Sequence, residues 1–128
     1  MTIKEVSEKY NISQDTLRYY ERVKVIPPVT RTAGGIRDYQ QEDLGWVEMA
    51  ICMRNAGLPI EGLIEYLHLF QEGDATIPAR LDLLNGQMEI LREKKQQIET
   101  TMERLAYKIE RYEEAVKTGT LVWTKKGE

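Results

Sequence analysis

The sequence predicts a mainly α-helical protein with a helix-turn-helix head, a small β-hairpin and a long helix that forms a coiled coil. Two short amphipathic segments open the chain, a stretch rich in proline, glycine and arginine follows them, and a heptad repeat of apolar residues covers the C-terminal part. A chain of 128 residues can form one small head and one extended element. The expected divisions are a head over 1–72, a long helix over 73–118 and a short tail over 119–128.

The first two segments predict a pair of helices joined by a short turn. Ile3, Val6 and Tyr10 have helical spacing, which predicts a helix over roughly residues 2–10. Ser13 can cap the free amides of a second helix, on which Leu17 and Tyr20 would face inward. Two helices separated by so few residues are typical of a helix-turn-helix.

A basic β-hairpin is expected after these helices. Pro27 and Pro28 end the helical region because proline lacks an amide donor and restricts the residue before it. Residues 29–31 and 36–39 are extended runs joined by "TAGG", whose glycines suit a tight turn. A two-stranded hairpin is marginal alone, so it should pack on the helices.

Two further helices should complete the head. Leu44, Val47, Ile51 and Leu58 share one face after Gln41. Pro59 then favours a new helix start, and the segment "EGDAT" ends that helix. The buried face of this last helix is expected to consist of Ile60, Leu63, Ile64, Leu67 and Phe70.

The heptad repeat indicates a coiled coil. Eleven of the twelve a and d positions are apolar or aromatic, and the exception is Lys95, which either fixes the register or bends the rod, or else points out of the seam. About 40 residues of helix extend roughly 60 Å, too far to be covered by a head of this size, so the expected partner is a second copy. The a series is Ile77, Leu84, Leu91, Ile98, Leu105 and Tyr112, and the d series is Leu81, Met88, Lys95, Met102, Ile109 and Val116.

Charge and composition exclude several classes of protein. The net charge is −3, but the residues through Gln40 carry +2 and the remainder carries −5, so the basic character lies in the opening stretch. Cys52 is the single cysteine, which excludes an internal disulfide and a multi-thiolate metal site within one chain. No secretory segment and no apolar run of about 18 residues is present, so we expect a soluble intracellular protein that does not enter a membrane.

The combination of helix, basic hairpin and dimerising rod predicts a protein that binds double-stranded DNA. An enzyme is not expected, because we find no catalytic carboxylate pair and no phosphate-binding glycine loop. We also find no nucleophile paired with a base, since the single histidine, His68, has no evident catalytic partner. No cofactor or metal is expected either. A coiled-coil interaction protein without a DNA role is the alternative, and the basic hairpin argues against it.

Several motifs together resemble the MerR family of bacterial transcription regulators. They are "TLRYYE" followed by "IPP", then "R-x-x-x-G-I-R-x-Y", then "ED" at a helix start, then "RNAGLPIE". The resemblance covers residues 2–72 and implies a winged helix-turn-helix with an antiparallel coiled-coil dimerisation helix. It also implies a homodimer in the bacterial cytoplasm, associated with the nucleoid, that distorts promoter DNA between the −35 and −10 elements so that RNA polymerase engages both.

The resemblance also implies roles for single residues. Arg18 and Tyr19 on the recognition helix should contact DNA, with Tyr20 in the core and Arg22 and Lys24 in solvent. The full set of expected DNA contacts is Gln14, Thr16, Arg18, Tyr19, Arg31, Arg37, Tyr39 and Arg54. The expected dimerisation residues are Leu84, Met88, Leu91, Ile98, Met102, Leu105 and Ile109.

Cys52 is the candidate sensor residue. "GIRDY", "CMRNAGL" and "LIEY" resemble the branch of the family that responds to aldehydes and nitrosative stress, the AdhR/NmlR group, in which a thiol at the matching position is implied to sense reactive carbonyls. The thiolate is the attacking form of cysteine. Two alternatives stay open: Cys52 is a small packed side chain, or the regulator has another effector or none.

Overall fold

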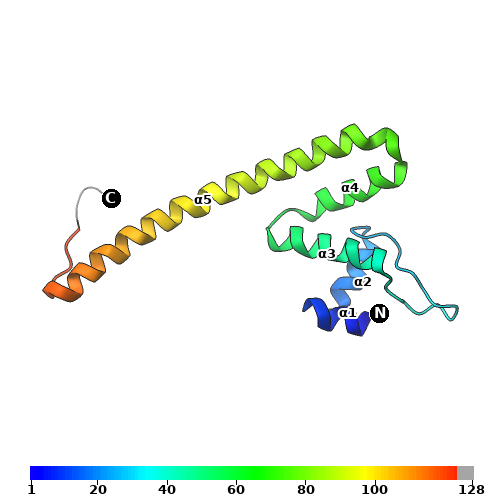
Figure 1. The fold of residues 1–128 in the computed structure, drawn as a ribbon, viewed down its shortest axis with the longest axis horizontal. Helices are drawn as coiled ribbons and strands as arrows, with labels where there is room; N and C mark the ends of the chain where they lie inside the picture. Colours follow the sequence, from blue (N-terminus) through cyan, green and yellow to red (C-terminus); the bar gives the residue numbers. More distant parts are fainter. Residues whose placement is uncertain (124–128) are drawn as a thin grey trace. The chain divides into compact units, whose positions relative to one another are not determined.

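The computed structural model describes residues 1–123 and contains five α-helices and a short 3₁₀ helix in that range (Figure 1). The mainly helical fold predicted from the sequence is confirmed. The chain forms two compact units, Met1–Met88, which holds the head, and Glu89–Glu128, which holds most of the long helix. The elements are α1 (Ile3–Tyr10), α2 (Gln14–Arg22), α3 (Gln41–Asn55), α4 (Ile60–Glu72), η1 (Asp74–Thr76) and α5 (Ile77–Thr118).

Local capping signals set the ends of α1 and α2. Thr2 accepts a hydrogen bond from the Glu5 amide at 3.1 Å, and the Glu5 carboxylate accepts one from the Thr2 amide at 2.8 Å, which forms a capping box. Asn11 ends α1 in the left-handed conformation, with φ of 52°. Ser13 then caps α2 by accepting from the Thr16 amide at 3.0 Å. The predicted helix pair is therefore present.

The hydrophobic core of the head lies among α1, α2, α3 and the segments that connect them. Val6 and Leu17 are fully buried, and Tyr20 is buried as predicted. Apolar side chains of the segment after α2 complete the core, and they include Val25 and Ile26. This packing fixes the orientation of α2, because its apolar face is held and its opposite face is left in solvent.

The predicted hairpin is present only in part. Its arms run antiparallel, with the Thr32 amide donating to the Ile36 carbonyl at 2.8 Å and the Asp38 amide donating to the Thr30 carbonyl at 2.7 Å. A single bridge pairs Arg31 with Arg37, and no β-strand forms within residues 1–123. Two short arms without a third strand make too few ladder hydrogen bonds for regular strands. We call residues 29–39 the wing.

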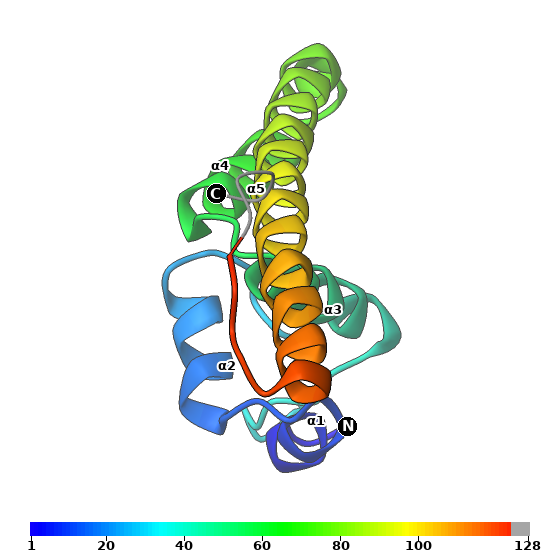
Figure 2. The same ribbon diagram turned by 90° about the vertical axis from the view of Figure 1, so that its left-hand side faces the viewer.

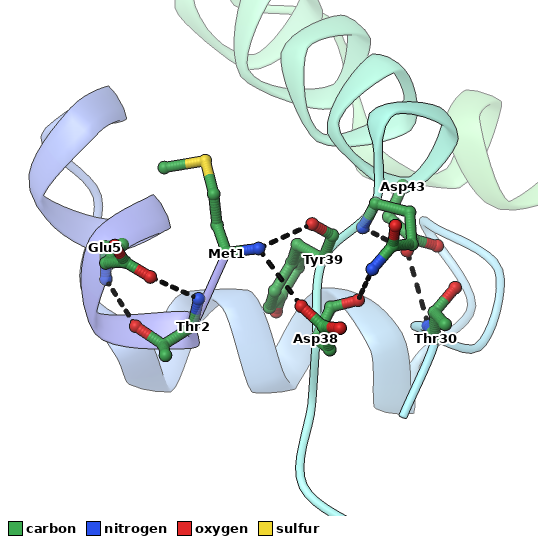
Figure 3. A network of polar contacts seen from close by, with 8 residues as sticks. Met1, Thr2, Glu5, Thr30, Asp38, Tyr39 and Asp43 are labelled. Atoms are coloured by element: carbon green, nitrogen blue, oxygen red, sulfur yellow. Dashed lines mark hydrogen bonds and ion pairs between the residues drawn. The ribbon is translucent and has the colours of Figure 1, made fainter. Parts of the chain in front are cut away.

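Polar contacts hold the base of the wing to the helices (Figure 3). The amino group of Met1 donates to the Tyr39 carbonyl at 2.8 Å and lies 3.2 Å from Asp38 Oδ1, and the Tyr39 amide donates to the Met1 carbonyl at 2.8 Å. On the other side, Asp43 Oδ2 in the first turn of α3 accepts from the Gln40 amide at 2.8 Å and from the Thr30 amide at 3.4 Å. Both ends of the wing are thereby fixed.

Helices α3 and α4 pack through aromatic side chains. The rings of Trp46 and Phe70 meet edge to face with centroids 5.1 Å apart, and Tyr66 lies 6.0 Å from Trp46. The predicted break at "EGDAT" is present: α4 ends at Glu72, the next residue Gly73 has a φ of +99°, and η1 leads into α5. Leu67 is the buried residue of α4, and Phe70 remains about half exposed.

Helix α5 is continuous over 42 residues and none of its side chains is buried. The apolar a and d residues instead line up as a largely exposed stripe, which we call the α5 seam. Lys95 is exposed, with its Nζ 3.9 Å from Glu99 Oε1. Exposure of so regular an apolar stripe indicates a surface made for a partner.

Beyond α5 the chain turns back alongside the last turns of the helix (Figure 2). Arg111 Nε donates to the Val122 carbonyl at 2.9 Å, and the ring of Trp123 lies 6.1 Å from Tyr107 and 6.2 Å from Tyr112. Trp123 therefore packs on the last turns of α5. The rest of the predicted tail, residues 124–128, lies outside the described residues.

Candidate nucleic-acid interface

The exposed face of α2 carries the predicted recognition residues. Arg18 and Tyr19 point away from the core, because Leu17 and Tyr20 occupy the buried face. Arg18 donates to Asp15 at 3.0 Å and to the side-chain carbonyl of Gln14 at 3.3 Å. These are exposed contacts within one helix, of the weak kind that a DNA phosphate or base can replace.

A cleft of about 310 Å³ brings three predicted DNA contacts together. Thr16 and Tyr19 line it from α2, and Arg54 lines it from the end of α3. Arg54 is exposed, and Arg22, also exposed, lies over the Tyr19 ring at 5.3 Å. Residues 38 positions apart in the sequence thus form one polar and cationic surface next to the recognition helix. The apolar floor of the cleft consists of Tyr20, Leu58, Ile60 and Leu63.

The wing arginines lie against α2 instead of extending freely into solvent. Arg37 Nε donates to Glu21 Oε1 at 2.7 Å, and Arg31 lies 3.7 Å from Glu21 Oε2. The Arg37 side chain is 22% exposed and that of Arg31 is 44% exposed. The sequence analysis did not single out Glu21. The sequence did contain a signal for Glu21, because it is an acidic residue on the last turn of the recognition helix, within the most basic stretch of the chain.

Tyr39 is a correction to the predicted interface. The side chain is 1% exposed and belongs to the hydrophobic core, and its hydroxyl is buried without a hydrogen-bond partner within the described residues. In this conformation it cannot reach a phosphate. In a regular strand Arg37 and Tyr39, which are two positions apart, would point to the same side. The wing forms no regular strand, and packing of the Tyr39 ring in the core decides its direction.

Cys52 is exposed in the single chain, on the C-terminal half of α3. The interpretation of this thiol as a buried packing residue therefore does not hold for the isolated chain. Met49 and Met53, on the same helix, line an apolar pocket of about 120 Å³ with Leu63, Tyr66 and residues at the start of α5. Cys52 does not line this pocket, but its own exposure makes the predicted sensor residue accessible to a small reagent.

Comparison with known proteins decides the family. Residues 1–69, more than half of the chain, match the family described as MerR HTH family regulatory protein. This chain belongs to the MerR family. Its helix-turn-helix head is therefore the DNA-binding part of a transcriptional regulator.

Individual MerR proteins resemble the chain over different lengths. The HTH-type transcriptional regulator AdhR of Bacillus subtilis strain 168 is 53% identical over 91 residues, which are 71% of this chain and 65% of AdhR. A MerR family regulator from Listeria monocytogenes, solved as a crystal structure, is 43% identical with a TM-score of 0.87, covering 93% of this chain and 90% of that one. These relatives are transcriptional regulators and not enzymes, as the sequence predicted.

A second MerR structure shows a related protein on DNA. HiNmlR, described as a MerR family regulator lacking the sensor domain and bound to promoter DNA, is 28% identical with a TM-score of 0.83, covering 94% of this chain and 95% of that one. The present chain matches the MerR family through its head and continues into a long helix.

The α5 seam holds the predicted dimerisation residues of this MerR protein. Its C-terminal part forms an open apolar groove of about 400 Å³ between Leu105, Ile109, Tyr112 and Val116. Within residues 1–123 no cluster of histidine, cysteine or carboxylate side chains could hold a metal ion, and no helix is long and apolar enough to cross a membrane. The predicted seam residues Leu84, Met88, Ile98, Met102, Leu105 and Ile109 are exposed, and Leu91 is half-buried.

Proposed function

We propose that this protein is a homodimeric regulator that binds promoter DNA and distorts it between the −35 and −10 elements, so that RNA polymerase engages both. The observation that supports the proposal most directly is the cleft beside α2, where Thr16, Tyr19 and Arg54 converge on one surface. An α-helix fits the major groove, and cations and polar groups beside such a helix can contact the phosphates that border the groove. Gln14 and Arg18 lie on the same exposed side of α2 for contacts to base edges or phosphates.

Dimerisation through the α5 seam completes this proposal. Two seams zipped together in antiparallel orientation bury the exposed apolar residues of both copies, and the two heads then address two half-sites of one promoter. The net charge of −3 does not oppose binding, because the residues through Gln40, which include α2 and the wing, carry +2, and the acidic excess follows them in the sequence. The expected site of action is the bacterial cytoplasm.

Titration of a promoter fragment against salt tests DNA binding. We expect the logarithm of the binding constant to fall linearly with the logarithm of salt concentration, with a slope of about −0.9 for each phosphate contacted. Transcription in vitro with RNA polymerase, from the promoter upstream of the protein's own gene, tests activation. A chain that fails to bind this promoter at low salt contradicts the proposal.

We further propose that reactive aldehydes act on the regulator through Cys52. The thiolate sulfur adds to the carbonyl carbon, the carbonyl π electrons move to oxygen, and the resulting alkoxide takes up a proton to give a hemithioacetal. No oxidant or leaving group is needed. The exposed thiol on α3 supports this step, and the same helix carries Arg54 to the DNA-facing cleft.

Cys52→Ala tests the sensor role directly. We expect the variant to bind the promoter as the native protein does and to lose the change in transcription that formaldehyde or methylglyoxal causes. A variant that still responds to both aldehydes would leave a regulator with a different effector, or with none.

A further inference from the structure

Glu21 joins the recognition helix to both arms of the wing. It lies on the last turn of α2, and its side chain is 13% exposed. One carboxylate oxygen accepts from Arg37 Nε at 2.7 Å, and the other accepts from the Val29 amide at 3.2 Å and lies 3.7 Å from Arg31. A single carboxylate thus contacts the base, the outgoing arm and the returning arm of the wing.

The pairing within the wing makes this contact important. Arg31 and Arg37 face each other across the only bridge found in residues 1–123. Like charges placed directly opposite on neighbouring arms repel each other. Glu21 lies against both guanidinium groups, so its negative charge offsets this repulsion and draws both side chains toward α2.

Few other contacts fix the outer part of the wing. Asp43 and the buried side chains of Val29 and Tyr39 hold its base, whereas at the tip Ile36 is 68% exposed. Arg31 also donates to the Gly35 carbonyl at 2.9 Å, which fixes it to the turn but not to the helix. The orientation of the arginines relative to α2 therefore depends on Glu21.

We infer that Glu21 is a positioning residue that sets Arg31 and Arg37 at a fixed place relative to the recognition helix, so that the wing contacts phosphates when α2 enters the groove. This inference rests on the proposed function. Glu21 itself does not contact DNA, because its carboxylate repels phosphate and its oxygens are already taken up by Arg37, Arg31 and Val29.

The direction in which Glu21→Ala changes DNA affinity distinguishes a positioning role from an effect of charge alone. If Glu21 only reduced the positive charge of the wing, Glu21→Ala would raise DNA affinity and steepen its salt dependence. If Glu21 positions the arginines, the same substitution weakens binding although an acid has been removed. Each lost arginine–phosphate contact lowers the salt slope by about 0.9, and a symmetric dimer loses contacts in pairs, so the slope falls by at least about 1.8.

The experiment compares promoter binding by full-length native protein, Glu21→Ala, Glu21→Gln and Glu8→Ala from 50 to 300 mM salt. We expect on the order of tenfold weaker binding and a shallower slope for Glu21→Ala. Glu21→Gln keeps an acceptor for the Val29 amide, so it should fold as the native protein does and still bind more weakly. Glu8, an exposed acid on α1, provides the same charge change away from the wing and should not weaken binding. Circular dichroism and thermal unfolding verify folding.

A second comparison tests whether Glu21 acts through the arginines. In a variant that carries both Arg31→Ala and Arg37→Ala, adding Glu21→Gln should change promoter affinity less than about twofold. An undiminished effect in that background overturns the inference, as does a Glu21→Gln protein that is folded and binds at least as tightly as the native one. If the native protein itself ignores the promoter at 50 mM salt, the proposed function fails, which is a distinct result.

Discussion

Among single residues, Tyr39 has the most unusual environment. Its ring lies in the hydrophobic core of the head, but its hydroxyl is buried with no hydrogen-bond partner among residues 1–123, and burial raises the pKa of this phenol above its ordinary value. A buried hydroxyl without a hydrogen bond loses its hydration and gains nothing in return. The ring therefore stabilises the head, whereas the hydroxyl opposes that stability.

Tyr39→Phe should leave the free energy of unfolding unchanged or raise it by up to about 1 kcal/mol, because only the unpaired hydroxyl is removed. Promoter affinity should not change, because the side chain lies in the core. Urea unfolding and promoter titration measure the two quantities. Weaker binding by a variant of native stability would mean that the hydroxyl reaches DNA in the complex.

Tyr10 provides the opposite case. Its hydroxyl donates to Glu48 Oε1 at 2.5 Å and so joins α1 to α3. Burial, followed by the hydrogen bond and the charge of Glu48, raises the pKa of Tyr10 to about 12. Because the folded-state pKa lies above the unfolded value near 10, the contribution to stability is complete below pH 10 and is lost as the pH rises through about 12.

Tyr10→Phe should therefore destabilise the head at pH 7 by about 0.5–1.5 kcal/mol, the usual net value of one hydrogen bond. The difference in phenolate absorbance between native and variant protein should show one tyrosine that ionises near pH 12. Equal stability at pH 7 together with a difference spectrum centred near pH 10 would contradict the hydrogen bond.

At the scale of elements, the glycines inside helices show where a larger side chain would collide with a neighbouring residue. At Gly45 in α3 and Gly86 in α5, a Cβ would have no described atom within 4 Å apart from its chain neighbours and the backbone of its own helix. Gly62 in α4 differs, because a Cβ there would lie 2.9 Å from Nε2 of Gln87. Gln87 of α5 thus packs closely on the backbone of α4.

Gly45→Ala and Gly86→Ala should each stabilise the protein by about 0.5–1 kcal/mol, because alanine loses less backbone entropy in a helix than glycine does. Gly62→Ala should stabilise less, since the end of the Gln87 side chain has to move. Urea unfolding of the three variants measures the order. A gain at Gly62 equal to that at Gly86 would show that the contact with Gln87 imposes no cost.

At the scale of the whole molecule, the exposed α5 seam is the feature that one chain cannot satisfy. Ten large apolar or aromatic side chains of α5 are exposed, from Ile77 to Val116. In the proposed dimer a second seam covers them, and the two heads bind DNA as one unit. Linking two heads raises apparent affinity by about 10²–10⁴ through effective concentration.

Leu105→Asp should convert the protein to a monomer and weaken promoter binding by about 100-fold or more, because a charge at an a position of the seam has no counterion and loses its hydration. Ala106→Asp, one residue along and exposed outside the seam, is the matched control and should remain dimeric. Sedimentation equilibrium and promoter titration measure both. A dimeric Leu105→Asp protein would place the interface elsewhere.

Periodicity and capping residues were sufficient to predict the helices of this protein, because such signals act within a few residues. The Ser13 cap, the buried pair Leu17 and Tyr20, the break at "EGDAT" and the continuous α5 all follow from neighbours along the chain. The motif combination in the head likewise predicted the MerR family. The antiparallel direction of the coiled coil stays a prediction.

Only the tertiary structure decided which polar residues of the head face solvent. Tyr39 lies in the core and not at the interface, Arg37 lies against Glu21, and Thr16, Tyr19 and Arg54 meet in one cleft. Each of these outcomes joins residues that are 16 to 38 positions apart, or depends on the volume left in the core. Local sequence fixes the direction of a helix face, but the direction of a side chain in a short irregular wing follows from packing against elements elsewhere in the chain.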